Sequence, residues 1–307
     1  HTIADLDRGI MCGGVMVKNG RRSGRQRYRC GECGLQEQSA PRPKRMEQKL
    51  WREHVEGKQS IKQLANTYAR SERTVRRSLE RHALKPPRHS PRPVVLAMDA
   101  TFWGRKWGVL VARDPHEQEN IHVHELTQET PEEYRRARME IEALGYTLLG
   151  VVVDGKRGVR AIFRDIPVQY CQFHQMKTVT KYLTRKPMTN AGWELRAITL
   201  TLARTTEAEF TERLVRWHER WAEFLAERTP CSCCKEKRWP YTHRRLRAAV
   251  RSLRTNLPFL FTYQKYPELH IPNTTNTLDG SFSHLKNQVA NHRGKRPARR
   301  YKIIQEL

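Results

Sequence analysis

Two short apolar runs that each stop at an aspartate constrain the fold of this chain more than any other feature. "PVVLAMD" ends at Asp99, and "YTLLGVVVDG" reaches Asp154. Runs this short and this apolar are typical of strands that are covered on both faces. Between them, "TPEEYRRARMEIEALG" predicts a helix that Thr130 caps, that Glu133 supports through a capping box and that Gly145 ends. The pattern therefore predicts a strand, a helix and a second strand of one sheet.

The flanking segments extend this sheet. Residues 94–113 have the pattern of a hairpin, "NIHVHEL" predicts a third strand, and a helix from about residue 157 precedes a strand at "VQYC". A meander followed by β-α-β units predicts an α/β fold with a mixed sheet and right-handed crossovers. If the strands before Asp99 and Asp154 are parallel neighbours, both carboxylates emerge at one edge, where open α/β sheets bind ligands. Grouped carboxylates suit Mg²⁺ or Mn²⁺. The alternative for either aspartate is a turn or a helix cap.

A third acid stands alone in "IPNTTNTLDGSFSHLKNQVANHRG". The spacing of Leu278, Phe282, Leu285 and Val289 predicts the buried stripe of a helix. A parallel stripe beside it contains Asp279, Ser283 and Lys286. Asp279 would therefore stand at the core-facing edge of the helix and point at the sheet. The alternative is an acid near a helix N-terminus that stabilises the helix dipole.

The charge of the chain indicates a polyanionic partner. Lys and Arg number 58 against 32 Asp and Glu, a formal net charge of +26. Neutralising phosphates releases counterions, so such a surplus favours nucleic acid. An anionic membrane is the weaker alternative, because no long helix combines a basic face with a broad apolar one and no apolar run approaches the ~20 residues of a membrane span. The seven cysteines favour a reducing cytoplasm, with metal binding as the alternative.

A cysteine pair near the start predicts a zinc-ribbon-like segment over residues 8–36. Cys30-x-x-Cys33 has the spacing of one zinc knuckle. Cys12 could be the second cysteine of another Cys-x-x-Cys pair, but the first position of that pair, residue 9, is glycine. Two alternatives stay open: a ribbon that holds Zn²⁺, and a ribbon-shaped remnant without it. The stretch "RRSGRQRYR", residues 21–29, has the pattern of a basic hairpin that would lie on phosphates, and the alternative is a solvated charged loop.

Residues 47–83 predict a helix-turn-helix DNA-binding domain. Its first apolar stripe consists of Ile61, Leu64, Ala65 and Tyr68, and its second of Thr74, Val75 and Leu79. A turn near residues 69–70 would separate the helices, and Ser71 would cap the second. The expected DNA-binding set is Ser71, Arg73, Thr74, Arg76 and Arg77. The alternative is a pair of ordinary amphipathic helices.

The rest of the chain has a clear organisation. Residues 84–93 hold four prolines and predict an extended linker. The α/β domain would then cover residues 94–307. Its strand-and-helix pattern is interrupted by a purely helical stretch from about residue 189 to 262. Thr206 and Glu209 would open a helix with Phe210, Leu214, Trp217, Trp221 and Phe224 on one face, and we expect its aromatic side chains to form a core.

The combination of these motifs resembles a known family. Asp99, Asp154 followed by "CQFH", a helical interruption, and "NTTNTLDGSFSHLK" before a basic tail are similar to bacterial insertion-sequence transposases of the Mutator-like DDE superfamily, in its zinc-ribbon-bearing subgroup. The resemblance implies a ribonuclease H-like mixed-sheet catalytic domain with an all-α insertion at about 185–270. It implies Asp99, Asp154 and Asp279 as the catalytic triad, with Asp279 where the family usually has Glu.

The resemblance also implies that Cys171 and His174 lie near the catalytic site. Taken by their chemistry, these two residues could supply half of a metal site, or they could be a packed cysteine and a hydrogen-bonded histidine. The chemistry that the resemblance implies is phosphoryl transfer with two Mg²⁺ or Mn²⁺ ions. This reaction would cleave DNA at the ends of the transposable element and join those ends to target DNA. Lys286 would hold a phosphate oxygen. The partners would be double-stranded DNA, as terminal inverted repeats and target, and a second copy of the chain, because two ends must be brought together.

Two other functions remain open from the sequence. One is a catalytically inactive or co-opted transposase-derived DNA-binding protein, favoured by Gly9 and Asp279. The other is a metal-dependent nuclease without strand transfer. In each case we expect a location in the cytoplasm of a bacterium or archaeon, associated with the nucleoid and not with a membrane.

Overall fold

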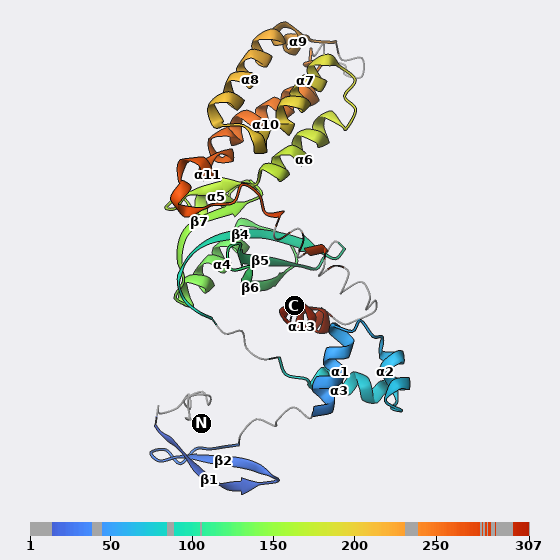
Figure 1. Cartoon of the computed structure of the whole chain (residues 1–307), viewed down its shortest axis with the longest axis vertical. Coiled ribbons are helices and arrows are strands. Elements are labelled where there is room, and N and C mark those ends of the chain that lie inside the picture. The colour runs from blue at the N-terminus through green and yellow to red at the C-terminus, as the bar shows by residue number, and fades with distance from the viewer. Residues whose placement is uncertain are drawn as a thin grey trace. The chain divides into compact units, whose positions relative to one another are not determined.

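The structure is a computed structural model with two compact units, residues 1–85 and 86–307. The first unit holds a small sheet and three helices, and the second holds a larger sheet with helices on both faces (Figure 1). The residues that it describes are 14–38, 45–84, 89–104, 106–230, 239–276, 278, 280, 282–283, 286 and 297–306.

The small sheet of the first unit is antiparallel, in the order β1-β2-β3. Ser23 and Gly24 join the first two strands with φ of 50° and 75°. Two consecutive residues with positive φ form the tight turn that matches the twist of a hairpin. The hairpin expected around residues 21–29 is therefore present. Its strands are β1 (Met16–Arg22), β2 (Arg25–Cys30) and β3 (Gln36–Gln38).

Three helices follow in the first unit: α1 (Arg45–Val55), α2 (Ile61–Thr67) and α3 (Glu72–Arg81). The Ser71 hydroxyl accepts a hydrogen bond from the backbone N–H of Thr74, so the predicted cap is confirmed. The prediction that Thr74 belongs to the buried stripe is wrong, because Thr74 is exposed and Ser78 is buried instead. Ser78 lies one turn after Thr74, on the buried side of α3 with Val75 and Leu79.

The larger sheet of the second unit has five strands in the order β6-β5-β4-β7-β8. β4 pairs antiparallel with β5 and β5 with β6, whereas β4 with β7 and β7 with β8 are parallel. The predicted mixed α/β sheet is confirmed. The strands are β4 (Pro93–Phe102), β5 (Gly108–Asp114), β6 (Glu119–Leu126), β7 (Thr147–Val153) and β8 (Val168–Tyr170).

Each face of this sheet has its own apolar core. Alternate residues of β4 divide between them, with Leu96 and Met98 in one core and Val95 and Ala97 in the other. The first core is covered by α4 (Pro131–Ala143) and α5 (Val159–Ile162). The second is covered by Ile271, Leu278 and Phe282 and by α13 (Pro297–Glu306), whose Ile304 is buried there. Both apolar runs are therefore covered on two faces, as predicted.

Two local predictions in this unit are wrong. β4 does not stop at Asp99 but continues to Phe102, because it stays paired with β5 up to Phe102 and Gly108. Thr130 is the N-cap of α4 without a side-chain cap hydrogen bond. The expected capping box with Glu133 does not form, since the carboxylate of Glu133 instead bonds His124 at 2.9 Å.

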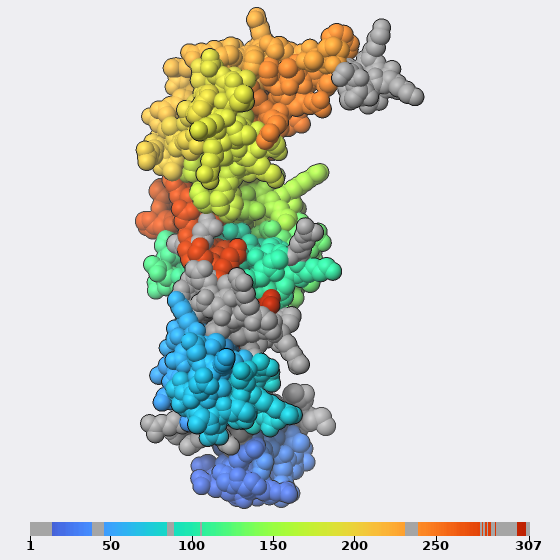
Figure 2. Space-filling view, turned by 90° about the vertical axis from the view of Figure 1, so that its right-hand side faces the viewer, coloured from blue at the N-terminus to red at the C-terminus, as the bar shows by residue number. Residues whose placement is uncertain are grey.

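The helical part of the second unit begins after β8 with the helix labelled α6 in Figure 1. Figure 2 shows its closely packed side chains in yellow and orange. Phe210, Leu214 and Trp217 are buried on one face of α8, and a capping box of Thr206 and Glu209 starts that helix, as predicted. Its elements are α6 (Gln172–Leu183), α7 (Asn190–Leu200), η2 (Leu202–Arg204), α8 (Glu207–Arg220), α9 (Ala222–Ala226), α10 (Arg244–Leu260), α11 (Thr262–Lys265) and η3 (Pro267–Leu269).

A buried amide joins this helical part to the sheet. Gln169 in β8 is fully buried, and its Nε2 donates to the carbonyl of Leu260 at 2.9 Å while its Oε1 accepts from the N–H of Tyr263 at 3.0 Å. The Thr262 hydroxyl donates to the carbonyl of Val168 at 2.7 Å. These bonds satisfy backbone groups where α10 ends inside the protein. Over the described residues, no helix is both long enough and apolar enough to span a membrane.

An ion pair at the far end of the sheet gives a test of stability. Arg92 donates to the buried Asp114 carboxylate at 2.8 Å, and the other oxygen of Asp114 accepts from the N–H groups of His116 and Glu117. We expect Asp114→Asn to lower the free energy of unfolding by about 2 kcal/mol at neutral pH, because it removes a charge-assisted bond at a buried position. Urea unfolding measures this change.

The same pair predicts a pH dependence. Burial raises the pKa of Asp114, but the bonds from Arg92 and the backbone outweigh it and leave the pKa below its ordinary value of 3.8. The ionised carboxylate therefore stabilises the fold fully above about pH 3.8, and this contribution is lost as the pH falls through the folded-state pKa. Glu223→Gln is the control, because Glu223 is exposed and forms no ion pair in the described part of the chain, so its loss is expected to change stability by under about 0.5 kcal/mol. Equal losses in the two variants would contradict this account.

Candidate active site

Asp99 lies inside β4, on the face of the sheet that Leu278 and Phe282 cover. It is two residues after Ala97 and therefore shares its face. Its side chain is 10% exposed, and its Oδ1 accepts a hydrogen bond from the N–H of Ala100 at 2.8 Å. The β4 strand remains paired with β5 here, but the pairing with β7 ends at Ala97 and Val152. Asp99 thus stands at the edge that the end of β7 leaves open.

Asp154 occupies the matching position on the neighbouring strand. Ala97 pairs with Val152 in the parallel register of β4 and β7, so Asp99 and Asp154 are each two residues beyond that pair. Neighbouring strands lie roughly 5 Å apart. The structure therefore brings the two predicted acids to one sheet edge.

Cys171 extends the same row to the third parallel strand. Val153 pairs with Tyr170, so Cys171 follows β8 as Asp154 follows β7. The N–H of Cys171 donates to the carbonyl of Val153 at 2.7 Å, and the residue is the N-cap of α6. One turn later, His174 places its Nε2 4.0 Å from Oδ2 of Asp99. The Cys-x-x-His spacing thus sets a histidine beside the first acid.

Cys171 and His174 stabilise each other's charged forms. The Cys171 sulfur beside the ring raises the pKa of His174 to about 9, against the effect of burial and with help from Asp99. Burial raises the pKa of Cys171, but His174 and Thr275 outweigh it and lower the pKa. The raised pKa favours the positively charged form of the imidazole next to Asp99.

The chain that leads to the third acid is held on the same edge. Thr275 is fully buried, and its N–H and hydroxyl donate to the sulfur of Cys171 at 3.3 and 3.4 Å. The N–H of Gln172 donates to the carbonyl of Asn273 at 3.0 Å. Asp279 lies outside the described residues. It follows Thr275 by four positions, and four residues span at most about 14 Å.

A second set of polar groups surrounds Asp154. Its Oδ1 accepts from the N–H of Lys156 at 2.9 Å, and the ammonium of Lys156 pairs with Glu129 at 3.1 Å. The Tyr134 hydroxyl donates to the other oxygen of Glu129 at 2.7 Å. Burial, together with the charge of Glu129, raises the pKa of Asp154 despite the Lys156 N–H and the cationic charges of His174 and Lys156. The sequence pattern points to none of Glu129, Tyr134 and Lys156 as site residues, and only the position of Lys156 two residues after Asp154 could have indicated one of them.

The donor set of this edge fits a hard divalent cation. Asp99 and Asp154 supply carboxylate oxygens, and the raised pKa of Asp154 reflects first its burial and then the negative charge of Glu129. Within the described ranges, no group of three or more His, Cys, Asp and Glu side chains could hold a metal by itself. A complete set would need Asp279, which is not among them.

The predicted zinc ligands are only partly described. Cys30 is buried at the end of β2 and Cys33 is exposed, while Cys12 lies outside the described residues. The N–H of Gly34 donates to the carbonyl of Cys30 at 3.2 Å and that of Cys30 to Leu35 at 2.8 Å, so the Cys-x-x-Cys segment forms a tight turn.

No family model and no curated protein matches this chain.

The remaining predicted residues lie on exposed surfaces. Arg73, Arg76 and Arg77 are exposed on α3, and Arg76 pairs with Glu72 at 3.3 Å. The Ser71 hydroxyl is engaged as a cap and lies 2.9 Å from the exposed Thr74 hydroxyl. Lys286 is exposed in the second unit. The α3 face is therefore cationic and open to a ligand.

Proposed function

We propose that this protein is a DDE-type DNA transposase whose catalytic acids are Asp99, Asp154 and Asp279. The observation that carries the proposal is the register of the parallel strands, which sets Asp99 and Asp154 at matching positions of β4 and β7. A cationic chain with +26 formal charge would bring DNA to this edge. The order β6-β5-β4-β7-β8, with a meander before the parallel strands, supports the ribonuclease H-like fold that the resemblance implies.

The residues at this edge have distinct parts in the proposed chemistry. Asp99 and Asp154 would supply ligands together with Asp279, and backbone N–H groups of Ala100 and Lys156 hold the two described carboxylates in place. Two divalent ions, when bound, would lower the pKa of the attacking hydroxyl and neutralise charge on the scissile phosphate. The charged His174 beside Asp99 would orient that carboxylate, and Lys286 would contact a phosphate oxygen.

The reaction would proceed by two displacements at phosphorus. In the first, a water oxygen bonds to phosphorus at the end of the element, and the bond to the 3′ oxygen breaks and leaves a free hydroxyl. In the second, that hydroxyl bonds to a phosphorus of the target strand and displaces its 3′ oxygen. Each displacement exchanges one ester or water oxygen for another, so no covalent enzyme intermediate is needed.

The direct test uses the DNA that flanks the coding sequence. Labelled duplexes from both flanks would be incubated with the protein, Mg²⁺ and a target plasmid. Products joined to the plasmid support the transposase, and nicked products alone support the nuclease. A mobility shift without cutting supports the DNA-binding alternative, which the separately folded α1–α3 with its exposed arginines would favour.

The helix-turn-helix gives a prediction of its own. We expect Arg73→Gln/Arg77→Gln to reduce the slope of log K against log salt, where K is the DNA association constant, by about two. Each arginine would neutralise about one phosphate. Fluorescence anisotropy over a salt series measures the slope. Arg52→Gln/Lys58→Gln removes the same charge from exposed positions elsewhere in this unit and should leave the slope unchanged. A slope that drops equally in both variants would argue against DNA docking on α3.

A further inference from the structure

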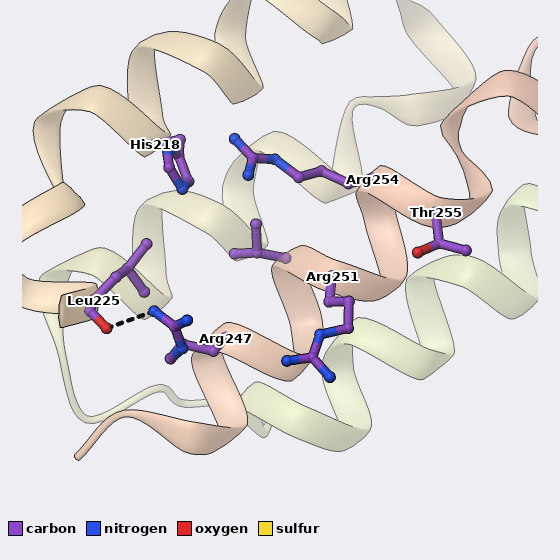
Figure 3. Close-up of a pocket in the computed structure, with 7 residues that line it drawn as sticks. His218, Leu225, Arg247, Arg251, Arg254 and Thr255 are labelled. Atoms are coloured by element: carbon purple, nitrogen blue, oxygen red, sulfur yellow. Dashed lines mark hydrogen bonds between the residues drawn. The ribbon is translucent and has the colours of Figure 1, made fainter. Parts of the chain in front are cut away.

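A hollow in the helical part of the second unit is lined with arginines. Arg247, Arg251 and Arg254 are spaced i, i+4 and i+7 along α10 and so share one face of that helix. They line a hollow of about 210 Å³ together with His218 from α8 and Leu225 from α9 (Figure 3). An apolar cavity of about 150 Å³ accepts benzene, so there is room for a phosphate group.

One of these arginines is already held in place. Arg247 donates to the carbonyl of Leu225 at 2.7 Å, and its guanidinium lies 3.6 Å from the centre of the Tyr241 ring (Figure 3 shows the hydrogen bond). A guanidinium has five N–H donors, and those not used on Leu225 have no other partner in the described part of the chain. Because the side chain is fixed by the fold, little rotamer entropy would be lost when it binds an anion.

The other two arginines carry charge that the described residues do not neutralise. Arg251 and Arg254 are exposed, and neither has an ion pair or hydrogen bond within the described part of the unit. Some exposed arginines of other helices form ion pairs, such as Arg136 with Glu140 at 2.8 Å and Arg220 with Glu194 at 3.3 Å. The feature that sets Arg251 and Arg254 apart is that both line the same hollow as Arg247.

The pKa of His218 depends on the positive charge around the hollow. Burial lowers the pKa of His218, and the positive charges of Arg254 and Arg247 lower it further, against the smaller effect of Glu219. α10 itself carries five arginines and no acid. Like charges gathered around one hollow repel each other, and an anion with several oxygen acceptors would relieve that repulsion.

We propose that the hollow lined by Arg247, Arg251 and Arg254 is a phosphate-binding site that takes a phosphodiester of the DNA backbone. The site has the chemistry of phosphate recognition: a preoriented guanidinium, two unpaired ones, and a floor of apolar side chains that includes the buried Val250. DNA as the source of the phosphate rests on the proposed function. The helical part would then bind DNA in addition to contributing to the core beside the sheet.

The test measures DNA affinity without cleavage. In a chain carrying Asp99→Asn, we expect Arg251→Gln/Arg254→Gln to reduce the slope of log K against log salt for a duplex of arbitrary sequence by about two. Arg204→Gln/Arg213→Gln is the matched control, because both arginines are exposed in the same helical part, form no ion pair with the described residues and do not line the hollow. The control should keep the parent slope. An unchanged slope in the first variant, or an equal loss in the control, overturns the proposal.

A second measurement separates DNA from free phosphate. Inorganic phosphate is titrated into the full chain while the ring protons of His218, assigned by their loss in His218→Gln, are followed by NMR. Chemical-shift changes of the His218 ring that vanish in Arg251→Gln/Arg254→Gln, together with a reduced slope of log K against log salt for DNA, support a phosphodiester site. Shifts with an unchanged DNA slope show a site for free phosphate and overturn the DNA assignment. A chain that binds DNA through the hollow but never joins ends would reject the transposase and leave the phosphate site standing.

Discussion

Asparagine in place of Asp99 is expected to lower the rate of DNA cleavage by about a thousandfold or more, a loss of roughly 4 kcal/mol of transition-state stabilisation. Asparagine keeps an oxygen that can accept the N–H of Ala100, which now bonds Asp99 Oδ1 at 2.8 Å, but it removes the negative charge. The fold should therefore persist while the affinity for divalent cations falls. Initial rates on labelled flanking DNA in Mg²⁺ measure the effect.

Two controls make this result specific. DNA affinity in the absence of divalent cations should be unchanged in Asp99→Asn, since the proposed DNA-binding arginines lie elsewhere. Asp165→Asn makes the same chemical change at a side chain that is 54% exposed and outside the site, and it should cleave at the parental rate. If Asp99→Asn still cuts at the parental rate, Asp99 is not a catalytic residue and the assignment of the site is wrong.

Loss of the buried amide of Gln169 is expected to lower the free energy of unfolding by about 4 kcal/mol. Gln169→Ala removes one of the two donors to the Leu260 carbonyl, at 2.9 Å, and the acceptor of the Tyr263 N–H, at 3.0 Å. It also leaves a cavity where the side chain is fully buried. The Tyr263 N–H would then be buried without a hydrogen bond. Chemical denaturation of the whole chain, followed by tryptophan fluorescence, measures the loss.

Gln172 provides a graded comparison. Its Nε2 also donates to the Leu260 carbonyl at 2.9 Å, but its own Oε1 is buried without a partner in the described part of the chain. Gln172→Leu therefore removes one bond and one unsatisfied acceptor, and we expect a loss of under about 1 kcal/mol. If the two variants lose equal stability, the bonds of Gln169 do not anchor the helical part to the sheet.

The sequence predicts those parts of the fold that depend on local signals. The apolar runs before Asp99 and Asp154 predict two strands of one mixed sheet, and the side chains of Ser71 and Thr206 predict two helix starts, all of which are present. Periodicity and capping act within a few residues, so they can be read without tertiary contacts. The end of β4 could not be read in this way, because its pairing with β5 continues to Phe102 past the polar Asp99.

The candidate site depends on long-range geometry that the sequence does not contain. Two aspartates at the ends of apolar runs indicate a shared edge, but the matching register of Asp99 and Asp154 follows from how β4 and β7 pair. The bonds from Thr275 to the sulfur of Cys171 join residues 104 positions apart. At Glu133 a long-range contact overrides a local signal. Its spacing predicts a helix cap, but its carboxylate bonds His124 of β6 instead.

The most direct measurement is a crystal structure of the protein with Mn²⁺, located by its anomalous scattering. The account predicts a manganese peak within roughly 2.5 Å of carboxylate oxygens from Asp99, Asp154 and Asp279, the range of direct coordination. No peak at this edge under saturating Mn²⁺, or an Asp279 carboxylate more than about 10 Å from any ion shared by the other two, would contradict it.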